Sequence, residues 1–140
     1  MVGKVIVTQG GLARELLEAA RTIVGPFGNF EAVTLDWTED PSTARERLAA
    51  AIDRADTGDG VLVLADMFGS TPCNLAMTFL EKGRVDVLAG TSLPIVVRLA
   101  GPTPEGLGPT ELAHWAQGKG RSCLCVGSDR GREAQCGTEG

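Results

Sequence analysis

Residues 61–72 read Val-Leu-Val-Leu-Ala-Asp-Met-Phe-Gly-Ser-Thr-Pro, so that an apolar run leads directly into a polar turn. The run is typical of a strand that is buried on both faces, and the Ser-Thr-Pro at its end is typical of a helix start. Residues 5–12, Val-Ile-Val-Thr-Gln-Gly-Gly-Leu, repeat this arrangement. In open α/β folds, ligands bind where strand ends lead into helices at one edge of a parallel sheet. The two turns therefore mark one candidate site.

Strand and helix patterns alternate along the rest of the chain. Apolar runs predict strands, and apolar residues at helical spacing predict the helices between them. The predicted strands cover residues 2–8, 30–35, 61–65, 85–89 and 122–126, and the predicted helices cover 12–24, 41–55, 71–80, 93–99 and 110–117. This alternation predicts an α/β fold, with a doubly wound and mostly parallel sheet of about five strands and helices on both faces.

Length and composition are those of one small domain. The 140 residues are 43% hydrophobic and 22% charged, which is ordinary for a chain that buries its own core. We expect one domain over residues 2–127, followed over 128–140 by a polar, glycine-rich tail that is disordered. The apolar run at 5–7 is far too short for a signal peptide or a membrane span, so a cytoplasmic location is expected.

Charge and cysteine spacing exclude several further classes. The net charge of -5 argues against nucleic acid and anionic membrane as direct partners. Cys73, Cys123, Cys125 and Cys136 have no metal-ligand spacing and are expected to be free thiols, Cys73 being inert. The only histidine, His114, is remote in sequence from both turns and is expected on a helix face. No metal and no cofactor is expected.

The two turns carry the polar groups from which a site could be built. Asp66 places a carboxylate at the end of an apolar strand, where it needs solvent or hydrogen-bond donors. The Ser70 and Thr71 hydroxyls, with the backbone N–H groups of the helix start, could bind an anion. No Gly-x-x-x-x-Gly-Lys motif occurs, which argues against nucleotide phosphates. The alternatives are that Asp66 only caps the turn and that the turn at Gly10 is a plain connection.

Three separated motifs resemble one known family. They are Val-Ile-Val-Thr-x-Gly-x-Leu-Ala at 5–13, Gly-Asp-Gly-Val-Leu-Val-Leu-Ala-Asp-Met-Phe-Gly-Ser-Thr-Pro-Cys-Asn-Leu-Ala at 58–76, and Val-Leu-Ala-Gly-Thr-Ser-Leu-Pro at 87–94. In this order they resemble the mannose-family enzyme IIA domain of the bacterial phosphoenolpyruvate-dependent sugar phosphotransferase system. The resemblance covers roughly residues 2–127.

The resemblance implies a phosphoryl shuttle. In that family, a histidine at the end of the first strand takes a phosphoryl group from the phosphocarrier HPr and passes it to a IIB partner. The family domain is cytoplasmic and reaches the membrane only through the transporter complex. Its last strand can be exchanged between two subunits of a homodimer. The family aspartate that contacts this histidine falls on Asp66. The phosphate-side groups fall on Thr8, Gly10, Phe68, Gly69, Ser70 and Thr71.

The sequence departs from the family at the residue that would accept the phosphoryl group. The position of the acceptor histidine is occupied by Gln9. A neutral imidazole is a nucleophile near neutral pH, whereas the nitrogen lone pair of an amide is delocalised. Two hypotheses follow: a IIA component that lost its acceptor, by engineering or naturally, or a regulatory binding module of the same fold that never carries phosphate. An unrelated anion-binding module is the third, and the three motifs disfavour it.

Overall fold

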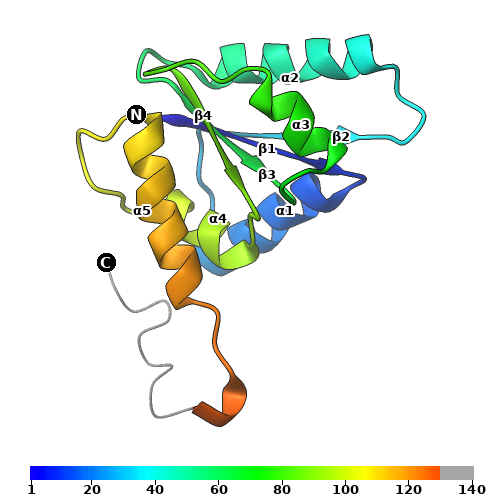
Figure 1. Ribbon diagram of the computed structural model, residues 1–140. Helices are drawn as coiled ribbons and strands as arrows, with labels where there is room; N and C mark the ends of the chain where they lie inside the picture. The colour runs from blue at the N-terminus through cyan, green and yellow to red at the C-terminus, as the bar shows by residue number, and fades with distance from the viewer. Residues whose placement is uncertain (130–140) are drawn as a thin grey trace.

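The computed structural model describes residues 1–129, which form a four-stranded parallel sheet covered by helices (Figure 1). The strand order is β2-β1-β3-β4. In chain order the elements are β1 (Gly3–Gln9), α1 (Leu12–Val24), β2 (Phe30–Leu35), α2 (Pro41–Ala55), β3 (Val61–Ala65), α3 (Thr71–Met77), β4 (Val85–Ala89), α4 (Leu93–Ala100), α5 (Pro109–Ser122) and a 3₁₀ turn at Gly127–Asp129. The predicted α/β class with a parallel sheet is confirmed.

The winding direction of the chain reverses between β1 and β3. From β1 the chain moves outward to β2 on one side, and it then returns to β3 and continues to β4 on the other side. The parallel register pairs Val7 with Ala65, so β1 and β3 end at the same edge of the sheet. In a doubly wound sheet this reversal opens a crevice at the carboxyl ends of the two strands. The polar turns that follow β1 and β3 lie at this crevice.

Both faces of the sheet are covered, which explains the continuous apolar runs in β1 and β3. One core lies under α2 and α3 and includes Val63 and Leu48. The other lies under α1, α4 and α5 and includes Ile6 and Leu62. Figure 1 shows α2 and α3 on one side of the strands and the other three helices on the opposite side. All five side chains of β3 are buried, so this strand is the rigid support of the turn at Asp66.

The predicted fifth strand at 122–126 is wrong. Ser122 is the last residue of α5, and residues 123–126 form no strand. We expected the helix to stop at Gly118, yet it continues because Gly120 lies against the Ile95 side chain, where a Cβ would come within 2.7 Å. This close packing of α5 on α4 outweighs the cost of about 1 kcal/mol that a glycine adds to a helix. Leu124 is left 89% exposed.

The end of α3 and the C-terminal boundary of the domain bear on two further predictions. The helix after β3 ends at Met77 instead of residue 80. The predicted boundary between domain and tail, at residues 127 and 128, falls within the 3₁₀ turn at Gly127–Asp129. The rest of the predicted tail lies outside the described residues. None of the helices between residues 1 and 129 has both the length and the hydropathy of a membrane span.

One charged side chain is buried beside the sheet. Lys4, on β1, is only 3% exposed, and its ammonium lies 5.7 Å from the centre of the Phe30 ring. Burial lowers the pKa of Lys4 below its usual value of 10.5 because the charged form loses its hydration. The unfolded chain therefore binds more protons than the folded chain between the lowered pKa and 10.5, and the free energy of unfolding rises with pH across that range.

Replacing this side chain by an uncharged one of similar length should stabilise the fold. We expect Lys4→Met to raise the free energy of unfolding at pH 7 by about 1 kcal/mol, since the unpaired buried charge is removed. The variant should also lose the part of the alkaline rise that Lys4 contributes. Urea unfolding at pH 7 and pH 10 measures both effects, with exposed Lys82→Met as the control. A variant less stable at pH 7 and with the original alkaline rise would contradict this assignment.

Candidate functional site

Asp66 joins the turns after β1 and β3. Its Oδ2 accepts a hydrogen bond of 3.0 Å from the backbone N–H of Gln9. Its Oδ1 accepts one of 2.8 Å from the N–H of Met67 and one of 2.6 Å from the Ser70 hydroxyl. Three donors thus compensate the carboxylate for lost hydration. The sequence placed Gln9, Asp66 and Ser70 at one edge, and the structure brings them into direct contact.

Ser70 connects this cluster to α3. Its hydroxyl donates to Asp66 and accepts a hydrogen bond of 3.2 Å from the N–H of Cys73, so it is the N-cap of the helix. Gly69 adopts a φ of 90°, a left-handed conformation that the sharp turn before the cap requires and that glycine tolerates best. Thr71, one residue further on, lines the space beside Gln9. The local sequence Gly-Ser-Thr-Pro thus fixes the direction in which α3 leaves the site.

The turn after β1 is held in place by two other contacts. The Thr8 side chain is fully buried, and its Oγ1 accepts a hydrogen bond of 2.7 Å from the N–H of Ala13 in α1. The N–H of Gly10 donates to the Leu35 carbonyl at the end of β2, at 2.8 Å. Thr8 therefore supports the start of α1, and Gly10 ties the turn to the neighbouring strand. Both lie next to Gln9 in the chain, but these two groups are already engaged within the protein.

A cavity of about 230 Å³ lies beside Gln9. Its other lining residues come from the end of β2 and the loop after it, from α2 and from α3: Leu35, Asp36, Trp37, Glu39, Pro41, Ala44, Thr71 and Leu75. Two of them are carboxylic acids, and none is a lysine or an arginine. No hydrogen bond of the Gln9 side-chain amide is found within residues 1–129. A side chain at position 9 therefore borders a small space with acidic groups on its wall.

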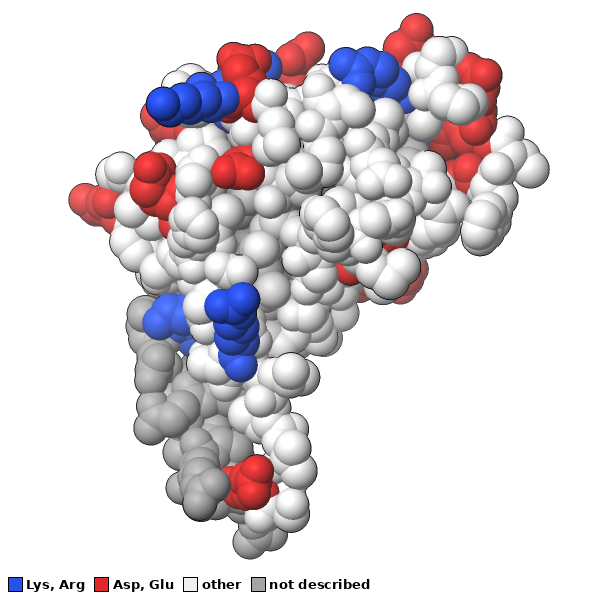
Figure 2. Space-filling model, viewed as in Figure 1, with Lys and Arg blue, Asp and Glu red and all other residues white. Residues whose placement is uncertain are grey.

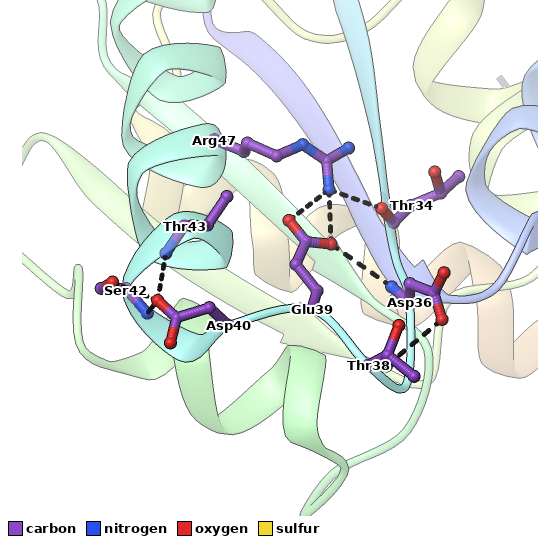
Figure 3. A network of polar contacts seen from close by, with 8 residues as sticks. All are labelled: Thr34, Asp36, Thr38, Glu39, Asp40, Ser42, Thr43 and Arg47. Carbon is purple, nitrogen blue, oxygen red and sulfur yellow. Dashed lines mark hydrogen bonds and ion pairs between the residues drawn. The ribbon is translucent and has the colours of Figure 1, made fainter.

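The acidic wall is itself an ordered network (Figure 3). The Arg47 guanidinium donates to both carboxylate oxygens of Glu39, at 2.7 and 2.8 Å, and to the Thr34 carbonyl at 2.9 Å. This donor lowers the pKa of Glu39 below its usual range, so the group stays ionised. The Arg47 guanidinium is thus hydrogen-bonded to the end of β2 and the loop after it. This third turn was not among the predicted site residues, although it follows β2, which ends at the same edge of the sheet.

Large apolar side chains surround the site on the surface. Trp37, Met67 and Phe68 are 88%, 64% and 76% exposed, and they come from the loops after β2 and β3. Leu12, at the start of α1, is half-exposed. We call these four residues the apolar rim. Figure 2 shows a broad uncharged area below α2, on the side of the molecule where α3 lies. Exposed apolar groups gathered around one crevice are typical of a surface that contacts another protein.

A comparison with known families identifies the chain. The family model described as the PTS system fructose IIA component matches residues 3–105. The chain belongs to the EIIA-man family. The resemblance that the three motifs indicated is confirmed, and the turns at Gln9 and Asp66 both lie within the matched part.

Sequence relatives of this EIIA-man domain include components of several sugar systems. The PTS system fructose-specific EIIA component of Bacillus subtilis is 33% identical over 100 residues, which are 71% of this chain and 68% of that protein. The PTS system mannose-specific EIIAB component of Escherichia coli K12 is 33% identical over 94 residues, 66% of this chain. The match spans only 29% of that longer protein.

Solved structures agree with this EIIA-man assignment. The mannose/sorbose specific IIA subunit from Enterococcus faecalis is 30% identical, has a TM-score of 0.78 and is matched over 90% of this chain and 95% of that one. The phosphotransferase component EIIA from Streptococcus agalactiae has a TM-score of 0.81 over 92% of this chain and 99% of that one. At 17% identity, the second likeness shows the fold alone.

Among residues 1–129 of the EIIA-man domain, the histidine and the cysteines do not line the cavity beside Gln9. His114 is exposed on α5, which packs on the face of the sheet opposite α3. Cys73 is fully buried in α3, and Cys73, Cys123 and Cys125 are free thiols. Cys136 lies outside the described residues. Among residues 1–129, no three histidine, cysteine or acidic side chains converge in a way that could hold a metal ion.

Proposed function

We propose that this chain is a IIA-like component of a sugar phosphotransferase system in which Gln9 stands at the position of the phosphoryl acceptor. The observation that carries this proposal is the hydrogen bond between the Gln9 N–H and Asp66, at the point where the winding of the sheet reverses. It supports a site of the family kind at this edge. Since an amide nitrogen is not a nucleophile, the chain itself holds no phosphoryl group there.

The same contact explains how the site can keep its shape without a histidine. Asp66 binds the backbone of residue 9 and not its side chain. The other two donors to Asp66 come from its own turn. The position of residue 9 is therefore independent of which side chain it carries. A histidine in its place would start from the same backbone and border the same cavity.

The proposed partners are an HPr-like phosphocarrier and a IIB component, with the chain acting as a cytoplasmic homodimer. The apolar rim supports protein docking at this edge, because Trp37, Met67 and Phe68 would gain from burial against a partner. Leu124 and Val126 are exposed in the single chain, and their burial against a second copy would support a homodimer without an exchanged strand. The chain alone is the state that the structure describes.

One observation favours the alternative, a regulatory binding module that never carries phosphate. The lining of the cavity beside Gln9 includes Asp36 and Glu39 but no lysine or arginine. The charge of Glu39 is compensated by its ion pair with Arg47, so the repulsion of a phosphoryl dianion comes mainly from Asp36, which no cation of the lining offsets. The apolar rim is unaffected by this charge. Such a module would bind its protein partner through the apolar rim, and its affinity would not be switched by phosphorylation of the chain.

Partner binding can be measured directly. We expect unphosphorylated HPr to shift amide signals of the turns after β1, β2 and β3 in NMR titrations of the chain. Phe68→Ala should weaken the affinity about tenfold, because an exposed aromatic at the centre of an interface contributes strongly. Ile23→Ala, at an exposed residue near the end of α1, is the matched control. No shifts at these turns, or equal weakening by both variants, would contradict a docking role.

A further inference from the structure

A second and larger cavity lies at the opposite edge of the sheet. Its volume is about 640 Å³. The start of β1 and the loop between α4 and α5 face each other across it, as can be followed in Figure 1 from the N-terminus to the loop before α5. Nothing in the proposed function uses this edge, because all the residues of that site lie at the carboxyl ends of the strands.

The cavity contains one buried cation without a counter-charge. Lys4 lines it and is 3% exposed, and its ammonium contacts the face of Phe30. Within residues 1–129, that ammonium makes no hydrogen bond and no ion pair. The acidic residues of the lining are Asp59 and Glu105. Asp59 is paired with the N-terminal ammonium of Met1, and Glu105 is exposed.

Apolar side chains form one part of the wall, and polar groups expose about as much surface to the cavity. Val2, Leu107 and Leu112 line it, together with Pro102 and Pro104 of the loop. Pockets for small molecules combine apolar side chains with a few polar groups that fix the orientation of the ligand, and the volume of this cavity is in their usual range. A buried charge without a partner is costly, so a ligand that supplies the opposite charge gains the pairing energy.

We propose that this cavity binds a small monocarboxylate with an apolar body, whose carboxylate pairs with the Lys4 ammonium. A single unpaired cation matches a single negative charge, since the Met1 ammonium of the lining is paired with Asp59. The carboxylates of Asp59 and Glu105 at the same cavity disfavour a second one, which argues against phosphate esters. The apolar body of the ligand lies against Val2, Leu107 and Leu112.

The probe for the test is benzoate, with benzamide as its neutral counterpart of the same shape. In NMR titrations of the full chain, we expect benzoate to shift amide signals of residues 2–4 and 101–108 in a saturable way. Benzamide should bind at least about tenfold more weakly, because it cannot neutralise the ammonium. Equal affinities for the two compounds, or benzoate shifts that avoid both segments, would overturn the proposal.

Variants separate Lys4 from general charge effects. Lys4→Met should reduce benzoate affinity about tenfold or more, while Lys82→Met, at an exposed lysine of a turn, should leave it unchanged. Equal losses in both variants, or no loss in Lys4→Met, would also overturn it. Should Lys4→Met fail to give a folded spectrum, the comparison of benzoate with benzamide on the unaltered chain decides alone. This result is independent of HPr binding at the other edge.

Discussion

Replacing Gln9 by histidine is expected to turn the chain into a phosphoryl acceptor. In the presence of phosphoenolpyruvate, enzyme I and HPr, the Gln9→His variant should gain about 80 Da, the mass of one phosphoryl group. The imidazole nitrogen supplies the lone pair that the amide lacks. Asp66 holds the backbone of residue 9 whatever its side chain, so the new group starts from the correct position. Intact mass spectrometry measures the gain.

The matched control is Gln9→Asn, which changes the side chain without adding a nucleophile. It should gain no mass under the same conditions. A second control combines Gln9→His with Asp66→Ala, where the turn that carries the histidine loses its anchor; we expect slower and less complete labelling. If Gln9→His stays unlabelled while a known IIA domain in the same mixture is labelled, position 9 is not the acceptor position, and the proposed function loses its basis.

Removing the carboxylate of Asp66 should destabilise the fold strongly. Asp66→Ala leaves the Gln9 N–H, the Met67 N–H and the Ser70 hydroxyl without their acceptor. Hydrogen bonds to a charged group contribute more than neutral ones, and a partly buried donor left unpaired is costly. We expect the free energy of unfolding to fall by about 3 kcal/mol. Urea unfolding followed by circular dichroism measures the change.

Two other substitutions calibrate this result. Ser70→Ala removes one of the three donors and the cap of α3, and should cost about 1 kcal/mol. Glu46→Ala, on the exposed surface of α2, should change stability by less than about 0.5 kcal/mol. A loss for Asp66→Ala no larger than that for Glu46→Ala would show that the carboxylate does not hold the two turns together.

The position of the site could be predicted from the sequence because its two turns follow strands that are buried on both faces. The runs at 61–65 and 5–8 are typical of strands inside a covered parallel sheet, and parallel strands bring their carboxyl ends to one edge. The structure then shows that these two strands are neighbours. The contact between Gln9 and Asp66 follows from this topology. The sequence pattern does not reveal which group of residue 9 binds Asp66. In the structure it is the backbone N–H of Gln9.

Two features depend on tertiary contacts that no local pattern reveals. The acidic wall at Asp36 and Glu39 belongs to a loop without a recognisable motif, and only the fold brings it beside Gln9. The stretch at 122–126 has the composition of a strand, yet α5 extends into it because Gly120 packs closely on Ile95. Tertiary packing of this kind overrides local propensity.

The mass of the unaltered chain after incubation with phosphoenolpyruvate, enzyme I and HPr tests most directly whether the crevice at Gln9 has lost its phosphoryl chemistry. We predict that the mass stays constant, even when HPr in the same sample is fully phosphorylated. A stoichiometric gain of about 80 Da on the unaltered chain would contradict this, since a different residue would then be the acceptor.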